Sequence, residues 1–235
     1  MIVNCYLLES NFFMHTPANF DNLVLDSLLL DWIGALKSYS VDSLIVMGPA
    51  VTGGPRDRWL HAVYPPKILD LAQALAVSND FGYDWQSSDS PMVAWQSISR
   101  GIYADLSRWR LLALGHGLQS MVRVEFPLPR SRAFECFMFT PQAIHERADA
   151  AALVWSAMNV WPRIKRAIAD TVCPLSRREK ECLELAFDGL TAVESALLLD
   201  CSDRTVTYHL TNAMHKLEVD NKLAAVERAC WYGVI

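Results

Sequence analysis

The most informative stretch of the sequence is SDRTVTYHLTNAMHKL, residues 202–217, because its polar side chains could read a nucleic acid. Its apolar residues recur at helical spacing, which leaves a second face rich in hydrogen-bonding groups. That face holds Arg204, Thr207, Tyr208, Thr211, Asn212 and His215. Guanidinium and amide groups form paired hydrogen bonds with base edges in the major groove of DNA. The alternative is a solvated face on a helical bundle, and this stretch alone leaves both open.

Local signals around this stretch predict the helices that would position it. Ser176 with Glu179, and Thr191 with Glu194, have the spacing of capping boxes, in which a hydroxyl and a carboxylate satisfy the free amides of a helix start. Gly189 ends one helix just before Thr191 opens the next, so the turn between them is tight. Ser202 and Asn221 are further candidate N-caps. We therefore predict helices over 177–188, 192–199, 203–218 and 222–232.

The tight turn favours a helix-turn-helix, in which the helix after the turn enters the major groove. From Pro174 onward the chain also keeps a recurrent set of positions. They are Leu175, Arg178, Glu179, Glu181, Leu183, Gly189, Thr191, Glu194, Ala196, Ser202, Thr205, Val206, His209, Asn212, Ala213, Lys216, Leu217, Asn221, Ala225 and Val226. In order they follow L-T-x-R-E-x-E-x-L, A-x-G-K-T-x-x-E-I-A, S-x-x-T-V-x-x-H-x-x-N-A-x-x-K-L and N-x-x-x-A-V. The segment thus resembles the DNA-binding domain of the LuxR-type quorum-sensing regulators.

The resemblance implies which side chains would touch DNA. Arg204, Thr207, Tyr208 and Asn212 would face bases, while Thr191, Thr205 and Lys216 would hold phosphates. The segment departs from the family pattern at Leu190, where Lys is usual, and at Thr207, where a basic residue is common. From Pro174 onward seven Lys or Arg stand against ten Asp or Glu, a net charge of −3. We therefore expect one copy to bind DNA weakly and with strong salt sensitivity, and two joined copies to bind usefully.

The last predicted helix offers a candidate contact between two such copies. Leu223, Val226, Ala229 and Cys230 fall on one stripe, which resembles the dimerisation helix of the family. We take Leu223, Val226 and Cys230 as the predicted dimerisation residues. Packing of the same stripe inside the bundle is the alternative reading.

The resemblance continues, more thinly, into the first 170 residues, where the family has an autoinducer-binding domain. VYPPKILDLA is similar to the family's N-Y-P-x-x-W-x-x-x-Y and keeps Tyr64, while Ile68 and Ala72 replace the aromatic residues. The segment NDFGYDW…SPMVAW places Asp80 and Trp95 on the family's ligand-contacting Asp and Trp. A turn role for Asp80 and a core role for Trp95 are the alternatives.

The replaced aromatics would leave the carbonyls of a lactone unpaired, which argues against an ordinary acyl-homoserine lactone. Tyr83, Trp85 or Trp59 could substitute for the missing donors. We therefore predict a divergent pocket that includes Asp80, Trp95, Tyr64, Ile68, Ala72, Tyr83 and Trp85. Its ligand would be a small-molecule signal, either an acyl-homoserine lactone or a different autoinducer.

Element signals in the first part indicate a mixed fold. Helical patterns cover 20–36, 67–77 and 103–114, and a long helix is expected from Pro141 to about Ile168. Strand patterns cover 41–48, 57–64, 121–126 and 133–140, the last two forming a hairpin. These predict an α+β chain: an α/β/α sandwich with a mostly antiparallel sheet, followed by an all-α four-helix domain. The predicted domains are 1–169 and 175–235, with a linker at 170–174.

Composition excludes several other classes of protein. The chain is 52% hydrophobic and 20% charged, as in an ordinary globular protein. Its six cysteines lack metal-ligand spacing, so we predict no metal site and a reducing compartment. No apolar run suggests a membrane span or leader, so we expect a cytoplasmic protein. Catalytic motifs such as G-x-S-x-G and H-E-x-x-H are missing, so an enzyme is not predicted.

The sequence as a whole predicts a ligand-responsive DNA-binding regulator that binds an inverted-repeat promoter site as a homodimer. Its partners would be double-stranded DNA and a small-molecule autoinducer, and it needs no membrane or fixed cofactor. The alternative is an orphan anti-activator that forms heterodimers with another LuxR-type regulator and binds DNA weakly or not at all. Leu190, Thr207 and the acidic balance motivate that alternative.

Overall fold

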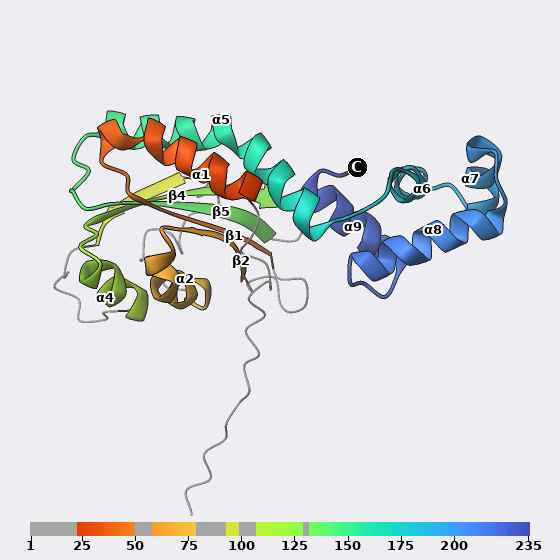
Figure 1. The fold of residues 1–235 in the computed structure, drawn as a ribbon, viewed down its shortest axis with the longest axis horizontal. Helices are drawn as coiled ribbons and strands as arrows, with labels where there is room; N and C mark the ends of the chain where they lie inside the picture. Colours follow the sequence, from red (N-terminus) through yellow and green to blue (C-terminus); the bar gives the residue numbers. More distant parts are fainter. Residues whose placement is uncertain (1–22, 50–57, 79–92, 99–106, 129–131) are drawn as a thin grey trace, which may run out of the picture.

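The computed structural model describes residues 23–49, 58–78, 93–98, 107–128 and 132–235. Within these residues one antiparallel five-stranded sheet has the strand order β2-β1-β5-β4-β3. Helices cover both of its faces, and a helical bundle follows at the end of a long helix (Figure 1). The predicted α/β/α sandwich with a C-terminal all-α part is therefore confirmed.

The elements of the sandwich mostly match their sequence signals. They are α1 (Leu23–Ala35), η1 (Lys37–Tyr39), β1 (Ser43–Pro49), β2 (Arg58–Tyr64), η2 (Pro66–Ile68), α2 (Leu69–Ala76), β3 (Val93–Ser97), α4 (Arg108–Gly115), β4 (Ser120–Leu128), β5 (Arg132–Thr140) and α5 (Arg147–Val172). β4 and β5 pair along their length, as the expected hairpin requires. β3 pairs with β4 and was not predicted from the sequence.

Alternation along the strands sorts their side chains onto two faces of the sheet. Leu44, Val46 and Cys136 point toward α1 and α5, on a surface that we call the α1/α5 face. Ile45, Met47 and Phe137 point toward α2 and α4, on the α2/α4 face. Both sides of β1 and β5 are buried, so these central strands read as continuous apolar runs in the sequence.

A buried ionic network lies at one end of the α2/α4 face. Glu135 is 3% exposed and accepts from Arg58 Nε at 2.5 Å and from Arg123 Nε at 2.7 Å. Arg123 also pairs with Glu125 at 2.6 Å. Arg58 donates to the carbonyl of Ser78 at 2.6 Å, which ties β2 to the end of α2. Burial lowers the pKa of Arg58, and Glu135 opposes this effect by stabilising the guanidinium.

The long helix α5 differs from its prediction at both ends. It begins at Arg147 with Glu146 as N-cap, not at Pro141. Hydrogen bonds hold the preceding segment in a non-helical path: Thr140 donates to the carbonyl of Gln142, and the Ile144 amide donates to Ser120 Oγ at 3.0 Å. The helix then continues to Val172, so the first three residues of the expected linker at 170–174 are helical.

The C-terminal bundle follows its sequence signals closely. It consists of α6 (Arg177–Phe187), α7 (Ala192–Leu199), α8 (Asp203–Lys216) and α9 (Lys222–Tyr232). Both capping boxes form, at Ser176 and at Thr191. Ser202 and Asn221 cap α8 and α9 as predicted. Gly189 adopts a φ of +87°, which permits the tight turn between α6 and α7.

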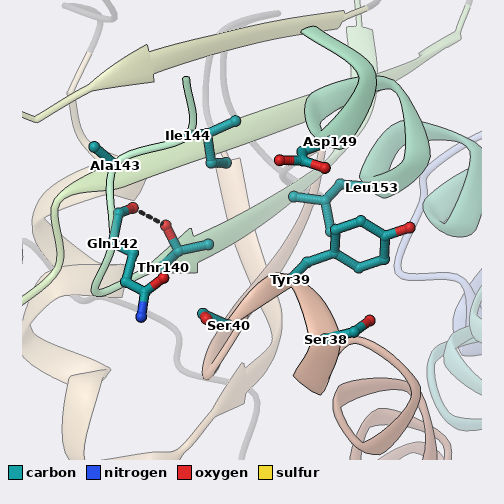
Figure 2. Close-up of a pocket in the computed structure, with 9 residues that line it drawn as sticks. All are labelled: Ser38, Tyr39, Ser40, Thr140, Gln142, Ala143, Ile144, Asp149 and Leu153. Atoms are coloured by element: carbon teal, nitrogen blue, oxygen red, sulfur yellow. Dashed lines mark hydrogen bonds between the residues drawn. The ribbon is translucent and has the colours of Figure 1, made fainter. Parts of the chain in front are cut away.

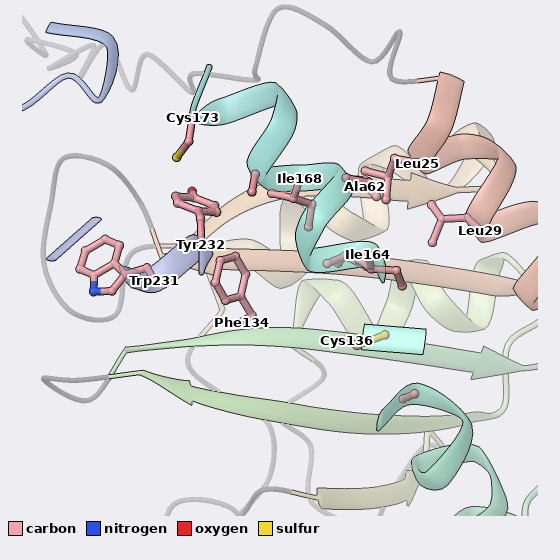
Figure 3. Packing of buried hydrophobic residues seen from close by; sticks show 14 of the residues in the cluster. Leu25, Leu29, Ala62, Phe134, Cys136, Ile164, Ile168, Cys173, Trp231 and Tyr232 are labelled. Atoms are coloured by element: carbon pink, nitrogen blue, oxygen red, sulfur yellow. The ribbon is translucent and has the colours of Figure 1, made fainter. Parts of the chain in front are cut away.

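The end of α9 packs against the sandwich, so the two parts share one core (Figure 3). The Tyr232 ring packs edge-on against two rings of the sandwich. Its centroid lies 5.5 Å from that of Phe134 and 6.1 Å from that of His61. The Arg132 guanidinium lies 4.4 Å from the centre of the Trp231 ring. Trp231 and Tyr232 are each 3% exposed. We call this contact the α9 docking site.

His61 gives the α9 docking site a pH dependence. Burial lowers its pKa to about 4, and its Nε2 has no hydrogen-bond partner among the described residues. The unfolded chain binds this proton near pH 6.5 and the folded chain only near pH 4. Stability should therefore fall as the pH drops through that window, by roughly 3 kcal/mol from this group. Urea unfolding at several pH values should show this slope reduced in His61→Phe, and an unchanged slope would contradict the assignment.

Candidate nucleic-acid interface

The third helix of the bundle, α8, buries one stripe and exposes the other. Val206, Ala213 and Leu217 are at most 2% exposed. Leu210 and Met214 pack against the same core. The apolar stripe expected from the sequence therefore faces the bundle. Its opposite face, which carries the residues predicted to face bases, points outward.

Three of these residues lie in the open. Arg204, Thr207 and Tyr208 are exposed, and Asn212 is half-buried. Arg204 forms no ion pair with the described residues, so its guanidinium is available. The Thr207 hydroxyl donates to the carbonyl of Asp203 at 2.9 Å, which leaves its oxygen as an acceptor. The four side chains span two turns and offer donors, acceptors and an aromatic ring along one edge of α8.

The predicted phosphate contacts are engaged within the bundle. The Thr191 hydroxyl donates to Glu194 Oε2 at 2.7 Å, and the Thr191 amide donates to the same oxygen at 2.8 Å. These two hydrogen bonds lower the pKa of Glu194, so a charged carboxylate stands at the start of α7. Thr205 is half-buried, and its hydroxyl lies 2.8 Å from Ser202 Oγ. Phosphate binding at either threonine would have to compete with these cap contacts.

Lys216 also has a partner inside the bundle. Its Nζ donates to Glu179 Oε2 at 2.9 Å, which ties the end of α8 to the start of α6. Burial of Glu179 raises the carboxyl pKa, but hydrogen bonds from Lys216 and Ser176 outweigh that effect and hold the pKa below its usual value. The ammonium therefore contributes less net positive charge to a docking surface than the sequence suggests.

The predicted ligand residues fall on both faces of the sheet. Ile68 and Ala72 are fully buried on the α2/α4 face. Tyr64 packs on the α1/α5 face. Trp95 is 41% exposed and lies opposite Val122, so it shares the α1/α5 face. These four residues therefore do not line one cavity in this structure.

The other predicted ligand residues, Asp80, Tyr83 and Trp85, lie outside the described residues. Trp59, the further candidate donor, is half-buried on β2 and its Nε1 has no hydrogen-bond partner among the described residues. No sequence signal pointed to the ionic network of Arg58, Arg123 and Glu135, which supplies the buried charges of this sheet.

A pocket on the sandwich lies away from all of these residues (Figure 2). It measures about 150 Å³ and sits where η1, the end of β5 and the start of α5 meet. Ser38, Ser40, Gln142 and Asp149 give it polar walls, and Leu153 adds an apolar side chain to its lining. The volume suits a few water molecules or a small polar compound.

The predicted dimerisation residues differ in exposure. Leu223 is 74% exposed, Cys230 is half-buried and Val226 is 9% exposed. Val226 lies in the core shared by the bundle and the sandwich. Its burial agrees with the alternative reading, in which this stripe packs inside the protein. Of the three, Leu223 offers the most surface to a second chain.

Comparison with known families identifies the family to which this chain belongs. The profile described as "Bacterial regulatory proteins, luxR family" matches residues 173–229. The transcriptional activator protein SolR of Ralstonia solanacearum is 35% identical over 203 residues, which is 86% of this chain and 75% of SolR. The fold and its helix-turn-helix therefore define a two-part bacterial regulator. The chain belongs to the luxR family.

Other relatives match over shorter segments. The transcriptional activator protein LuxR of Aliivibrio fischeri is 35% identical over 92 residues, or 39% of this chain and 37% of LuxR. The transcriptional activator protein AnoR of Acinetobacter nosocomialis is 33% identical over 95 residues, 38% of this chain and 40% of AnoR. These relatives are regulators and not enzymes. All three, SolR included, are described as transcriptional activators, which does not favour the alternative that this chain is an anti-activator.

Solved structures agree with the fold. Escherichia coli SdiA has a TM-score of 0.54 and 20% identity, with 90% of this chain and 92% of that chain covered. SdiA in complex with octanoyl-rac-glycerol has a TM-score of 0.52 and 20% identity, covering 89% of each chain. In the described part of this chain, no helix has the length and apolar character needed to span a bilayer.

Proposed function

We propose that this chain regulates transcription by inserting α8 into the major groove of DNA. The observation that carries the proposal is the exposed edge of α8, where Arg204, Thr207 and Tyr208 stand after a capped two-helix turn. Arg204 can pair with a guanine edge, and Asn212 can pair with adenine. Membership of the luxR family supports the same role.

The regulator acts as a dimer on an inverted repeat. The bundle carries a net charge of −3, so one copy neutralises few phosphates. Two linked copies raise the effective concentration of the second contact, and a two-fold dimer reads a symmetric site. Leu223 on α9, exposed next to the bundle core, supports a contact between bundles.

The sandwich receives a small-molecule signal that controls this dimer. Its layered fold is that of SdiA, which has been solved in complex with octanoyl-rac-glycerol. In this chain Ile68 of η2 and Ala72 of α2 are fully buried in the apolar core of the α2/α4 face. A signal bound there would be held mainly by an apolar chain, with its polar end met by other residues.

The test is duplex binding by the full chain across a salt series. A duplex enriched from a randomised pool should contain an inverted repeat and should bind more tightly than a scrambled duplex. Arg204→Ala should weaken the selected duplex about fivefold or more, because one base contact contributes about 1–3 kcal/mol. Binding with no sequence preference even at low salt would contradict the proposal.

The matched control is Arg177→Ala, which removes the same charge from α6. Arg177 is exposed and pairs with Glu181 at 2.8 Å, four residues along the helix. It should change the affinity for both duplexes by a small and equal factor. Equal losses from Arg204→Ala and Arg177→Ala would show that only total charge matters and that α8 does not read bases.

A further inference from the structure

The start of the helix-turn-helix carries large apolar side chains that the bundle does not bury. Phe187 is 63% exposed at the end of α6, and on α7 Val193 is 60%, Leu197 79% and Leu198 66% exposed. Val193 and Leu197 are four residues apart, so they lie on the same side of α7. We call these four residues the α7 surface. Exposed apolar groups gathered on one short segment mark interaction sites more often than isolated ones do.

The fold of α7 does not depend on this surface. Its buried residues are Ser195 and Ala196, while Ala192 and Leu199 pack against the small core of Cys182 and Val206. The helix is further fixed by the capping box at Thr191. Leu197 and Leu198 are therefore not among the residues that pack α7 into the bundle, and we expect a polar residue at either position to leave the fold intact.

The segment that carries the α7 surface has only acidic charges. Residues 182–203 contain no Lys or Arg, and their acidic residues are Glu184, Asp188, Glu194, Asp200 and Asp203. All five are exposed. Glu184 and Asp188, beside Phe187, would repel a phosphate backbone, so DNA is a poor occupant of the α7 surface itself. In a two-fold contact, a second copy would bring the same acidic segment against this one, so it is a poor occupant as well.

We propose that the α7 surface docks a basic amphipathic helix of a partner protein. The apolar stripe of that helix would lie on Val193, Leu197 and Leu198, and its Lys or Arg residues would pair with Glu184 and Asp188. Figure 1 places α7 at the end of the bundle far from the sheet, so a partner can reach it without disturbing the α9 docking site. The proposal goes beyond DNA reading by α8 and does not require it.

The test uses the full chain and a labelled synthetic helical peptide of about 18 residues built from Leu and Lys. A peptide with Glu in place of every Lys is the comparison. The Lys peptide should bind, more tightly at low salt, and the Glu peptide should not. Leu197→Ser/Leu198→Ser should weaken the Lys peptide at least about tenfold. Leu30→Ser/Leu111→Ser, which removes two leucines that are 51% and 47% exposed elsewhere, should bind like the parent.

Charge reversal makes the test specific. Glu184→Lys/Asp188→Lys should shift the preference from the Lys peptide toward the Glu peptide. Equal binding of both peptides, or an unchanged preference after reversal, would overturn the proposal. Self-association of the chain that disappears in Leu197→Ser/Leu198→Ser would assign the surface to a second copy instead. If Leu197→Ser/Leu198→Ser lost duplex binding as strongly as it lost peptide binding, the α7 surface would be assigned to DNA.

Discussion

Replacing Glu135 with Ala should lower the free energy of unfolding by about 3–5 kcal/mol, because it leaves two buried guanidinium groups without their shared carboxylate. Arg58 and Arg123 both bond to Glu135, and all three lie on the buried side of the sheet. After this change Arg58 keeps its hydrogen bond to the Ser78 carbonyl, and Glu125 is the carboxylate left to balance two guanidinium groups. Buried charge that is poorly balanced is costly, since the low dielectric around it cannot replace water. Urea unfolding of the full chain measures the loss.

Glu125→Ala is the matched control for this prediction. Glu125 pairs with Arg123 at 2.6 Å, but a quarter of its side chain is exposed. Arg123 would keep Glu135, so we expect a loss of only about 1 kcal/mol. Equal losses from the two variants would show that Glu135 contributes no more to the network than Glu125 and would contradict the prediction.

Tyr232→Ala should lower the free energy of unfolding by about 3–5 kcal/mol, because it empties the centre of the α9 docking site. The ring contacts Phe134 and His61 on the sandwich and is 3% exposed. Burial also raises the pKa of the Tyr232 hydroxyl, so the residue stays neutral across the working pH range. Urea unfolding of the full Tyr232→Ala chain measures this loss.

Tyr232→Phe keeps the ring and should change stability by less than about 1 kcal/mol. The bundle should remain helical in both variants, because its caps at Ser176, Thr191, Ser202 and Asn221 lie outside the docking site. A loss below about 1 kcal/mol in Tyr232→Ala would mean that α9 does not hold the two parts together.

Sequence patterns predicted the bundle well because its signals are local. A capping residue lies within three positions of the amide it satisfies, so Ser176 and Thr191 locate their helices from the sequence alone. The predicted helix 177–188 ends one residue beyond α6, and 203–218 two residues beyond α8. The luxR resemblance, stated from this segment, is confirmed by the family match.

The sandwich was less predictable because its determinants are distant in the chain. Pro141 suits a helix start, but hydrogen bonds from Thr140 and to Ser120 keep the following residues out of a helix. The motif around Tyr64 gave no indication that Tyr64 and Ile68 lie on opposite faces. The α9 docking site joins Tyr232 to His61 across more than half the chain, and no local pattern marks such a pair.

Regulation of transcription by this chain requires that the exposed edge of α8 touches DNA. The most direct measurement places a photoreactive benzoylphenylalanine at position 208 of the full chain and illuminates it with the enriched duplex. The same group at position 111, on α4 of the sandwich, is the control. We predict a covalent protein–DNA adduct from position 208 and none from position 111. A bound duplex that gives no adduct at 208, or equal adducts from both positions, would contradict this account.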